Sequence, residues 1–129
     1  MALSQVLSLS EMMMVQCEGW WQQRGLGRQY MTELEINIQD RQVFGTGVDC
    51  VAPFEIAGTI REDGVVELRK NYEFLHSVIY AGRYDGEGTF WGTWAIGNDR
   101  GDWTIRISRD QPAADSAAME IGPDAPFLF

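Results

Sequence analysis

The sequence is poor in the residues that most often build metal centres, disulfide frameworks and membrane spans. Its 129 residues contain one histidine and two cysteines, so we expect neither a multi-histidine metal site nor a network of disulfides. No segment approaches the roughly 20 apolar residues that a membrane-spanning helix needs. For Cys17 and Cys50 the composition favours two buried free thiols over a single bridge, because unpaired cysteines are commonly core residues.

Positive charge is also scarce, with 10 lysines and arginines against 19 aspartates and glutamates and a net charge of −9. A field of this sign repels phosphate backbones and anionic lipid head groups. The sequence therefore predicts no nucleic-acid partner and no membrane partner. The N-terminus lacks the basic region of a signal peptide, and polar residues interrupt its apolar stretch. We expect an acidic, soluble, cytoplasmic protein.

Familiar catalytic and cofactor motifs are missing. The chain has no phosphate-binding loop, no Cys-x-x-Cys pair, no His-Glu-x-x-His and no Gly-x-Ser-x-Gly. Carboxylates gather at the predicted turns, where such residues usually serve the turn itself; they are Asp49, Asp63, Asp85, Glu87, Asp99 and Asp102. The sequence thus predicts no cofactor, no metal ion and no catalytic residue, and it favours a protein that is not an enzyme.

Alternation of apolar and polar residues dominates the chain from Glu18 onward. Its clearest example is Tyr30 to Ile38, which predicts a strand with Tyr30, Thr32, Leu34, Ile36 and Ile38 on one face. Turn signals such as Asp63-Gly64 recur every 8–12 residues and separate about eight strands. The predicted strands lie near 19–21, 30–38, 41–49, 53–61, 65–70, 76–84, 89–96 and 102–108. No helix-length segment interrupts them, which indicates an all-β, antiparallel up-and-down barrel over residues 18–109.

The two ends of the chain have a different character. Helical spacing of apolar residues over Ala2 to Gln16 predicts an N-terminal helix, within a segment 1–17 that would close or flank the barrel. Residues 110–129 lack a pattern but end in Phe127-Leu128-Phe129. Because an exposed apolar end is unfavourable in water, we expect this tail to pack on the barrel or on a neighbouring subunit. The second option would make the protein a homo-oligomer.

A short phrase ending in Gly-Thr recurs inside the predicted strands, for example at Ala57-Gly58-Thr59 and Trp91-Gly92-Thr93. Glycine weakens a strand interior, so it indicates a bend or a close approach of another backbone. Strand parity places Gly58 and Gly92 on the inner face. They would help to close the barrel, and the room they leave would be taken by a ligand or by a neighbouring tryptophan.

Parity also brings polar side chains towards one barrel mouth. If Val66 and Leu68 face inward, Lys70 and Tyr72 continue that face, and His76 and Tyr80 follow on the returning strand. The opposite parity for residues 76–84 would instead bury Ser77, Ile79 and Ala81. With Tyr30, Trp94 and Trp103 as aromatic wall, this set has the composition of a small-ligand site. The alternative is structural, with Lys70 reaching the rim along its apolar stem and His76 bonded to a backbone carbonyl.

Gly19-Trp20-Trp21, after a predicted short helix, resembles the Gly-x-Trp opening of lipocalins and related calycin barrels. In that family a basic residue on the last strand packs over the tryptophan, and Arg106 would be the residue that packs over Trp21 here. Gly82-Arg83-Tyr84-Asp85 and Trp91-Gly92-Thr93-Trp94 are similar to phrases of avidin-type barrels. The resemblance implies a calycin-like barrel with a lumen. It transfers no ligand, because the second lipocalin signature and the biotin-contacting pattern are not evident.

An eight-stranded barrel is just wide enough to be filled by side chains or to hold one small ligand. The sequence therefore supports two functions. The first is non-catalytic binding of a small, partly apolar ligand in the lumen. The second is a structural or protein-interaction domain with a solid barrel, acting through outward Ile79 and Trp91, through the tail and through oligomerisation.

Overall fold

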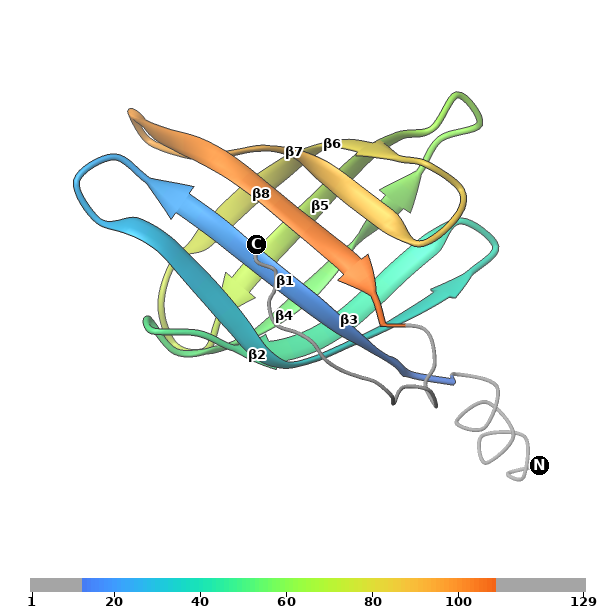
Figure 1. The fold of residues 1–129 in the computed structure, drawn as a ribbon, viewed down its shortest axis with the longest axis horizontal. Helices are drawn as coiled ribbons and strands as arrows, with labels where there is room; N and C mark the ends of the chain where they lie inside the picture. The colour runs from blue at the N-terminus through green and yellow to red at the C-terminus, as the bar shows by residue number, and fades with distance from the viewer. Residues whose placement is uncertain (1–12, 109–129) are drawn as a thin grey trace, which may run out of the picture.

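The structure, a computed structural model, describes residues 13–108 as a closed barrel of eight antiparallel strands in sequential order (Figure 1). The strands are β1 (Val15–Gln23), β2 (Gly27–Gln39), β3 (Gln42–Val48), β4 (Pro53–Ile60), β5 (Val65–Tyr72), β6 (Ser77–Tyr84), β7 (Thr89–Ile96) and β8 (Asp99–Ile107). Each pairs with the next, and β8 pairs back with β1. The predicted all-β, eight-stranded antiparallel barrel is confirmed.

The predicted terminal elements fall largely outside the described residues. Residues 1–12 and 109–129 are not described, so the N-terminal helix and the packed tail stay predictions. The last part of the expected helix, residues 15–17, belongs to β1. No helix of a length and apolarity suited to crossing a membrane occurs within residues 13–108.

A β-bulge in β2 overturns part of the predicted alternation. Glu33 has a positive φ of 53°, and the pairing of β2 with β3 shifts register between Thr32 and Glu35. The extra residue reverses the parity of the first part of the strand. Met31 is therefore buried, whereas Tyr30 is 55% exposed on the outer face. The prediction that Tyr30 and Thr32 share the inner face with Leu34 and Ile36 was wrong.

The parity of the neighbouring strands β5 and β6 is as predicted. Val66, Leu68, Lys70 and Tyr72 are buried on β5, and they are paired across to β6, where Val78 and Tyr80 are also buried. Inward Tyr80 excludes the alternative in which Ser77, Ile79 and Ala81 faced the core. Together with the inner residues of the other strands, these side chains form one continuous core inside the barrel.

The indoles of two inward tryptophans each extend past a glycine on the adjacent strand and donate a hydrogen bond to a carbonyl on the strand beyond it. Each tryptophan thereby connects three strands. Trp103 of β8 pairs with Gly92 of β7, and its Nε1 donates to the carbonyl of Ala81 on β6, 3.2 Å away. Trp94 of β7 pairs with Gly101 of β8 in the same way. Its Nε1 donates to a β1 carbonyl, that of Gln22, at 3.0 Å. Each indole therefore lies across the strand whose glycine leaves room for it.

The close approach at these glycines leaves no space for a side chain. A Cβ on Gly92 would overlap the Ala81 carbonyl oxygen, and one on Gly101 would lie 2.7 Å from Trp94 Nε1. Gly58 has a similar position on β4, where a Cβ would lie 2.7 Å from the Cα of Leu68. The space at Gly92 is thus filled by the β6 backbone of Ala81 and Gly82, which is the close approach of another backbone that a mid-strand glycine indicates, whereas at Gly101 the indole of Trp94 lies against the glycine.

The two cysteines are free thiols, as expected, but they differ in exposure. Cys17 lies in β1 and is half-buried, and burial raises its pKa to about 12. Cys50 is exposed in the loop between β3 and β4. The expectation that both thiols are buried was therefore wrong for Cys50, which lies at a barrel mouth.

Candidate functional site

The loops that follow β1, β3, β5 and β7 lie at one end of the barrel, at the left in Figure 1. This end is called the open mouth below. Three of its four loops carry exposed apolar side chains, namely Leu26, Val51, Phe74 and Leu75. The loops at the other end are polar, with sequences such as Arg61-Glu62-Asp63-Gly64 and Asp85-Gly86-Glu87-Gly88. The polarity of the two ends therefore differs, and the candidate site lies at the apolar one.

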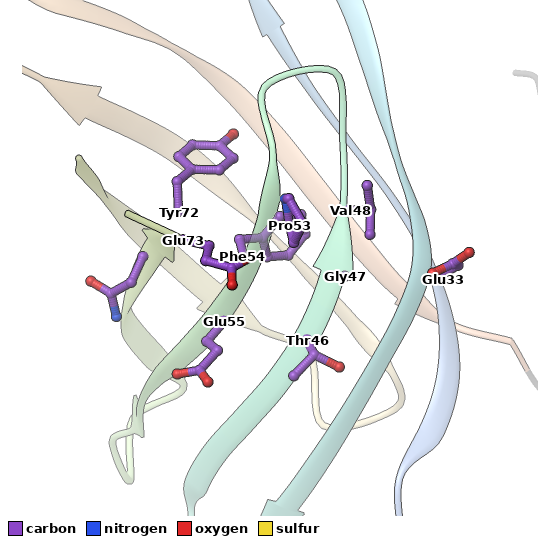
Figure 2. Close-up of a pocket in the computed structure, with 10 residues that line it drawn as sticks. Glu33, Thr46, Gly47, Val48, Pro53, Phe54, Glu55, Tyr72 and Glu73 are labelled. Carbon is purple, nitrogen blue, oxygen red and sulfur yellow. The ribbon is translucent and has the colours of Figure 1, made fainter. Parts of the chain in front are cut away.

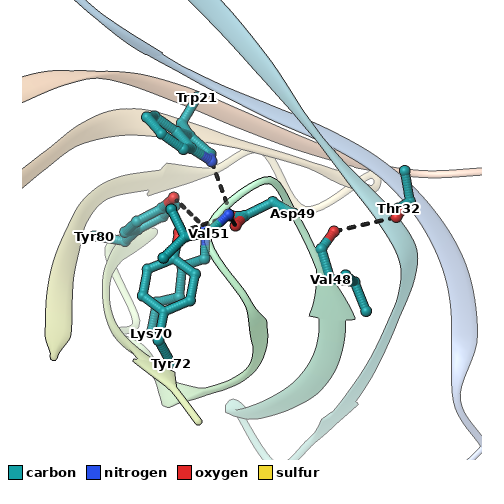
Figure 3. A network of polar contacts seen from close by, with 8 residues as sticks. All are labelled: Trp21, Thr32, Val48, Asp49, Val51, Lys70, Tyr72 and Tyr80. Atoms are coloured by element: carbon teal, nitrogen blue, oxygen red, sulfur yellow. Dashed lines mark hydrogen bonds and ion pairs between the residues drawn. The ribbon is translucent and has the colours of Figure 1, made fainter. Parts of the chain in front are cut away.

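The carboxylate of Asp49 is the centre of a polar network just inside the open mouth (Figure 3). Its Oδ2 atom accepts hydrogen bonds from Lys70 Nζ at 2.6 Å, Tyr72 OH at 2.7 Å and Trp21 Nε1 at 3.0 Å. Its Oδ1 atom accepts one from the backbone N–H of Val51 at 2.9 Å. The side chains of Asp49 and Lys70 are both 0% exposed. One oxygen thus collects three side-chain donors in a site closed to water.

Aromatic rings enclose the ammonium group of Lys70. Its Nζ lies 4.3 Å from the ring centroid of Phe54 and 4.8 Å from that of Tyr72. The rings of Tyr80 and Trp21 follow at 5.3 and 5.5 Å. Ring faces attract a cation, and the attraction is stronger where water is excluded. Nζ also donates to the Tyr80 hydroxyl at 3.1 Å. The cage and the carboxylate together make a fully buried lysine tolerable.

The protonation states follow from burial and from the ion pair. Burial alone raises the pKa of Asp49, but the hydrogen bonds and charge of Lys70, with the bond from Tyr72, outweigh it and hold the pKa below its ordinary value of 3.8. Burial lowers the pKa of Lys70 to about 8 against the opposing effect of Asp49. Burial, and then Asp49, raise the pKa of both Tyr72 and Tyr80. Both phenols therefore keep their protons and act as donors.

A cavity of about 280 Å³ opens above this network at the open mouth. Most of its wall is apolar or aromatic, and its lining residues are Trp21, Gln23, Val51, Tyr72, His76, Val78, Tyr80, Trp94, Ile96 and Asp99. The Tyr80 hydroxyl accepts a hydrogen bond from Lys70, and within residues 13–108 no hydrogen bond is donated by the Tyr80 hydroxyl itself. The cavity therefore offers a mostly apolar wall in which the Tyr80 hydroxyl can donate to a ligand, beside the polar side chains of Gln23, His76 and Asp99.

A larger hollow of about 510 Å³ lies along β3, β4 and β5 (Figure 2). It is lined by three glutamates, Glu33, Glu55 and Glu73, among other residues. The part of the chain that the structure describes contains no cluster of three or more His, Cys, Asp or Glu side chains that could hold a metal ion. Tyr72 of the Asp49 network lines both hollows, and the smaller cavity also shares Trp21 and Tyr80 with the network.

The structure brings most of the predicted site residues together. Tyr72, His76, Tyr80 and Trp94 line the cavity. Lys70 lies beneath it and does not reach the rim, because its side chain is completely buried in the aromatic cage. Trp103 supports the wall from below, with its ring centroid 4.9 Å from that of Tyr80. Tyr30 is not part of this group, since the bulge turns it to the outer face of β2.

Sequence reasoning missed Asp49, which it interpreted as a turn carboxylate. The signal was present in the parity of β3, where Val43, Gly45 and Gly47 are all buried. Asp49 is the next residue of that alternating inward series, directly after the end of β3. On β5, Lys70 and Tyr72 likewise extend the inward series of Val66 and Leu68. A carboxylate and a lysine that both point into the barrel, on or next to strands that reach the same mouth, indicate a buried ion pair.

Arg106 does not pack over Trp21 as the resemblance to lipocalins implied. It lies on the outer face of β8 and pairs with Glu18 at 3.2 Å, both side chains being more than half exposed. The arginine that does stack on a tryptophan is Arg28, whose guanidinium lies 3.9 Å from the ring centroid of Trp20 on the outside of the barrel. Trp21 instead faces the lumen and bonds to Asp49.

Comparison of the chain with models of known protein families, with curated proteins and with solved structures finds no match.

Replacing Asp49 by asparagine should show how much the ion pair contributes to the free energy of unfolding, and over which pH range it does so. Asn resembles protonated Asp, so near neutral pH the variant leaves the Lys70 charge unpaired and should lose about 3 kcal/mol of unfolding free energy. A carboxyl whose pKa is lowered by folding stabilises the folded protein at pH values above its ordinary pKa. That stabilisation is lost as the pH falls from the ordinary pKa through the lowered one. The difference between the two proteins should therefore shrink below about pH 4.

Urea unfolding of both proteins across this pH range measures the effect. Asp102→Asn is the matched control, because it removes an exposed carboxylate and should change the unfolding free energy by less than about 0.5 kcal/mol near neutral pH. A difference between wild type and Asp49→Asn that stays constant down to acid pH would show that the Asp49 charge does not stabilise the fold.

Proposed function

We propose that this protein is a calycin-like binding protein, without catalysis, which holds a small and partly apolar ligand in the cavity at the open mouth. The observation that carries the proposal is the cavity of about 280 Å³, whose wall is mostly apolar and whose floor holds the Tyr80 hydroxyl. Ligand sites in proteins typically combine an apolar wall with a few placed polar groups.

The size of the cavity limits the ligand. Its volume of about 280 Å³ is near the lower end of the range for ligand pockets, about 300–1,000 Å³. An apolar cavity of about 150 Å³ already holds benzene. The proposed ligand is therefore small, of the size of one substituted ring or a short branched chain. Indole faces and edges from Trp21 and Trp94, which meet at 84° with their centroids 5.9 Å apart, would contact it.

The polar groups suggest how the ligand is oriented. The Tyr80 hydroxyl can donate to an acceptor on the ligand, and its position is fixed by the bond from Lys70 and by packing on Trp103. His76 stands at the rim with its ring 5.2 Å from that of Tyr72 and offers a second polar contact. The ligand would thus enter with its acceptor towards Tyr80 and its apolar part against Trp21, Val78 and Trp94.

Filling the mouth with a larger side chain tests this function. Val51 is 40% exposed and lines the cavity, so Val51→Trp should obstruct entry without overpacking the core. We expect anisole, a neutral single ring with one acceptor oxygen, to bind the wild type, as measured by isothermal titration calorimetry. The variant should bind it at least about tenfold more weakly, a loss of about 1.4 kcal/mol.

Phe44→Trp is the matched control, because Phe44 is 39% exposed on the outside of β3 and its replacement leaves the mouth unchanged. Equal anisole binding by the two variants would contradict binding in this cavity, and so would a wild type that binds no anisole. Native mass spectrometry of protein from its own cells would then identify any ligand that is retained.

A second candidate function, interaction through the outer surface, is favoured by an aromatic row on the outside of the barrel. Tyr30 pairs with Trp20 across β1 and β2, Trp20 pairs with Thr104 of β8, and Thr104 pairs with Trp91 of β7. Tyr30 and Trp91 are 55% and 42% exposed. Strands lie about 4.8 Å apart, so Tyr30 and Trp20 are neighbours and Trp91 lies two strands beyond Trp20, with Thr104 between them; these residues are called the outer band below. Aromatic residues at this density are typical of protein interfaces.

The proposed occupant of the outer band is a second copy of the chain. If so, sedimentation velocity of the wild type should show a dimer or larger assembly, and Tyr30→Ser combined with Trp91→Ser should give a monomer. The control Phe44→Ser removes one exposed ring outside the outer band and should leave the assembly intact. A wild type that sediments as a monomer up to about 100 μM, a concentration far above the Kd of stable dimers, would contradict this candidate.

A further inference from the structure

We propose that the ligand of the open mouth is a monocarboxylate, and that it binds by replacing the carboxylate of Asp49 on its three side-chain donors. The inference rests on the proposed binding function and specifies its chemistry. In the absence of ligand, the Asp49 carboxylate would then occupy the position that the ligand carboxylate takes.

The donors and the acceptor of the network come from different kinds of structure. Trp21 is part of β1, and Lys70 and Tyr72 are alternate inward residues of β5, so the closed barrel fixes all three donors. Asp49 lies in the loop between β3 and β4. The donor set is therefore built into the rigid sheet, whereas the group that satisfies it is carried by a loop at the mouth.

The chemistry of the donors selects a carboxylate of charge −1. An indole N–H, an ammonium group and a phenol that keeps its proton all donate, so the group they receive must accept three hydrogen bonds. A neutral acceptor would leave the Lys70 charge buried without a partner, which is strongly unfavourable. A phosphate dianion would bring a second negative charge into the same aromatic cage. Exchanging one carboxylate for another leaves the charge of the site unchanged.

The cavity and the network share residues, so a ligand in the cavity is already in place for the exchange. Trp21 and Tyr72 both line the cavity and donate to Asp49 Oδ2. Asp49 leads into an exposed loop in which Cys50 and Val51 face the solvent. Turning its side chain outward would place the carboxylate in water, where hydration compensates for the lost bonds. No barrel strand would need to move.

Competition with Asp49 determines which carboxylates bind. A tethered group acts at a high effective concentration, commonly in the millimolar range, so a carboxylate without further contacts competes poorly. Contacts of an apolar body with Trp21, Val78 and Trp94 in the cavity must supply the advantage. We therefore expect aromatic or branched-chain carboxylates to bind, and acetate to be excluded from the wild type.

Removing the resident carboxylate provides the test. In Asp49→Gly, benzoate should raise the midpoint of thermal unfolding, whereas benzamide, which has the same ring without the charge, should not. Benzoate should bind this variant about tenfold or more tightly than it binds the wild type, because the tethered competitor is gone. Asp49→Gly combined with Lys70→Met is the matched control, and it should lose the preference for benzoate over benzamide.

A measurement on the wild type keeps the inference testable if Asp49→Gly does not fold. Titration with benzoate should shift the indole N–H resonance of Trp21 in a ¹H–¹⁵N spectrum, because the acceptor of that proton changes. Benzamide at equal concentration should shift it less. Trp103 donates to the Ala81 carbonyl and its indole resonance serves as an internal reference that should move little.

The outcomes separate this inference from the proposed function. If anisole binds at the mouth but benzoate has no advantage over benzamide in either protein, the carboxylate inference is overturned and the binding function stands. If none of the three compounds binds, both are overturned. A response to benzoate that persists in the variant lacking Lys70 would also overturn the exchange, because the charge partner would then be unnecessary.

Discussion

The ion pair between Asp49 and Lys70 is the interaction on which the open end of the barrel depends. Both side chains are fully buried, and their charged atoms are 2.6 Å apart. Removing two charges from water costs several kcal/mol each, so such a pair is stable only where further hydrogen bonds and favourable electrostatics support it. Here the support consists of Trp21, Tyr72, Tyr80 and the ring of Phe54. Four aromatic side chains at this end thus contact one carboxylate and one ammonium group.

The same residues connect the ion pair to the closure of the barrel. Trp94 crosses Gly101 to reach the β1 carbonyl of Gln22, and its ring meets that of Trp21 edge to face. Trp103 crosses Gly92 and packs on Tyr80, which receives a hydrogen bond from Lys70. The glycines, the tryptophans and the ion pair are therefore connected by one continuous set of packing contacts and hydrogen bonds. It holds the wall of the cavity at fixed positions, as a preorganised site requires.

Alternation of residue type was enough to predict the strands, because a barrel with one buried face imposes a period of two on nearly every strand. It failed where the backbone departs from that period. The bulge at Glu33 moved Tyr30 from the expected wall to the outer surface, and no side-chain pattern announces such an insertion. The parity of residues 76–84, which the sequence left open, was decided by burial of Val78 and Tyr80.

Asp49 shows a different limit. Its residue type and its place after a strand are those of an ordinary turn carboxylate, and five other acidic residues share that description. Only the inward series of β3, set beside that of β5, distinguishes it. Lys70 and Tyr72 were predicted at the mouth because their parity was followed to the end of the strand. The prediction for Lys70 and Tyr72, either a ligand site or a structural role at the rim, therefore lacked the carboxylate that both side chains bind.

The claim that this pair organises the mouth is tested most directly by a double-mutant cycle with Asp49→Ala, Lys70→Met and the combination, measured by urea unfolding near neutral pH. Each single variant leaves one buried charge without its partner and should lose about 3–5 kcal/mol of unfolding free energy. The double variant removes both charges. It should lose clearly less than the sum of the two, by about 2 kcal/mol or more. Losses that simply add would show that the two side chains stabilise the protein independently, and would contradict the account.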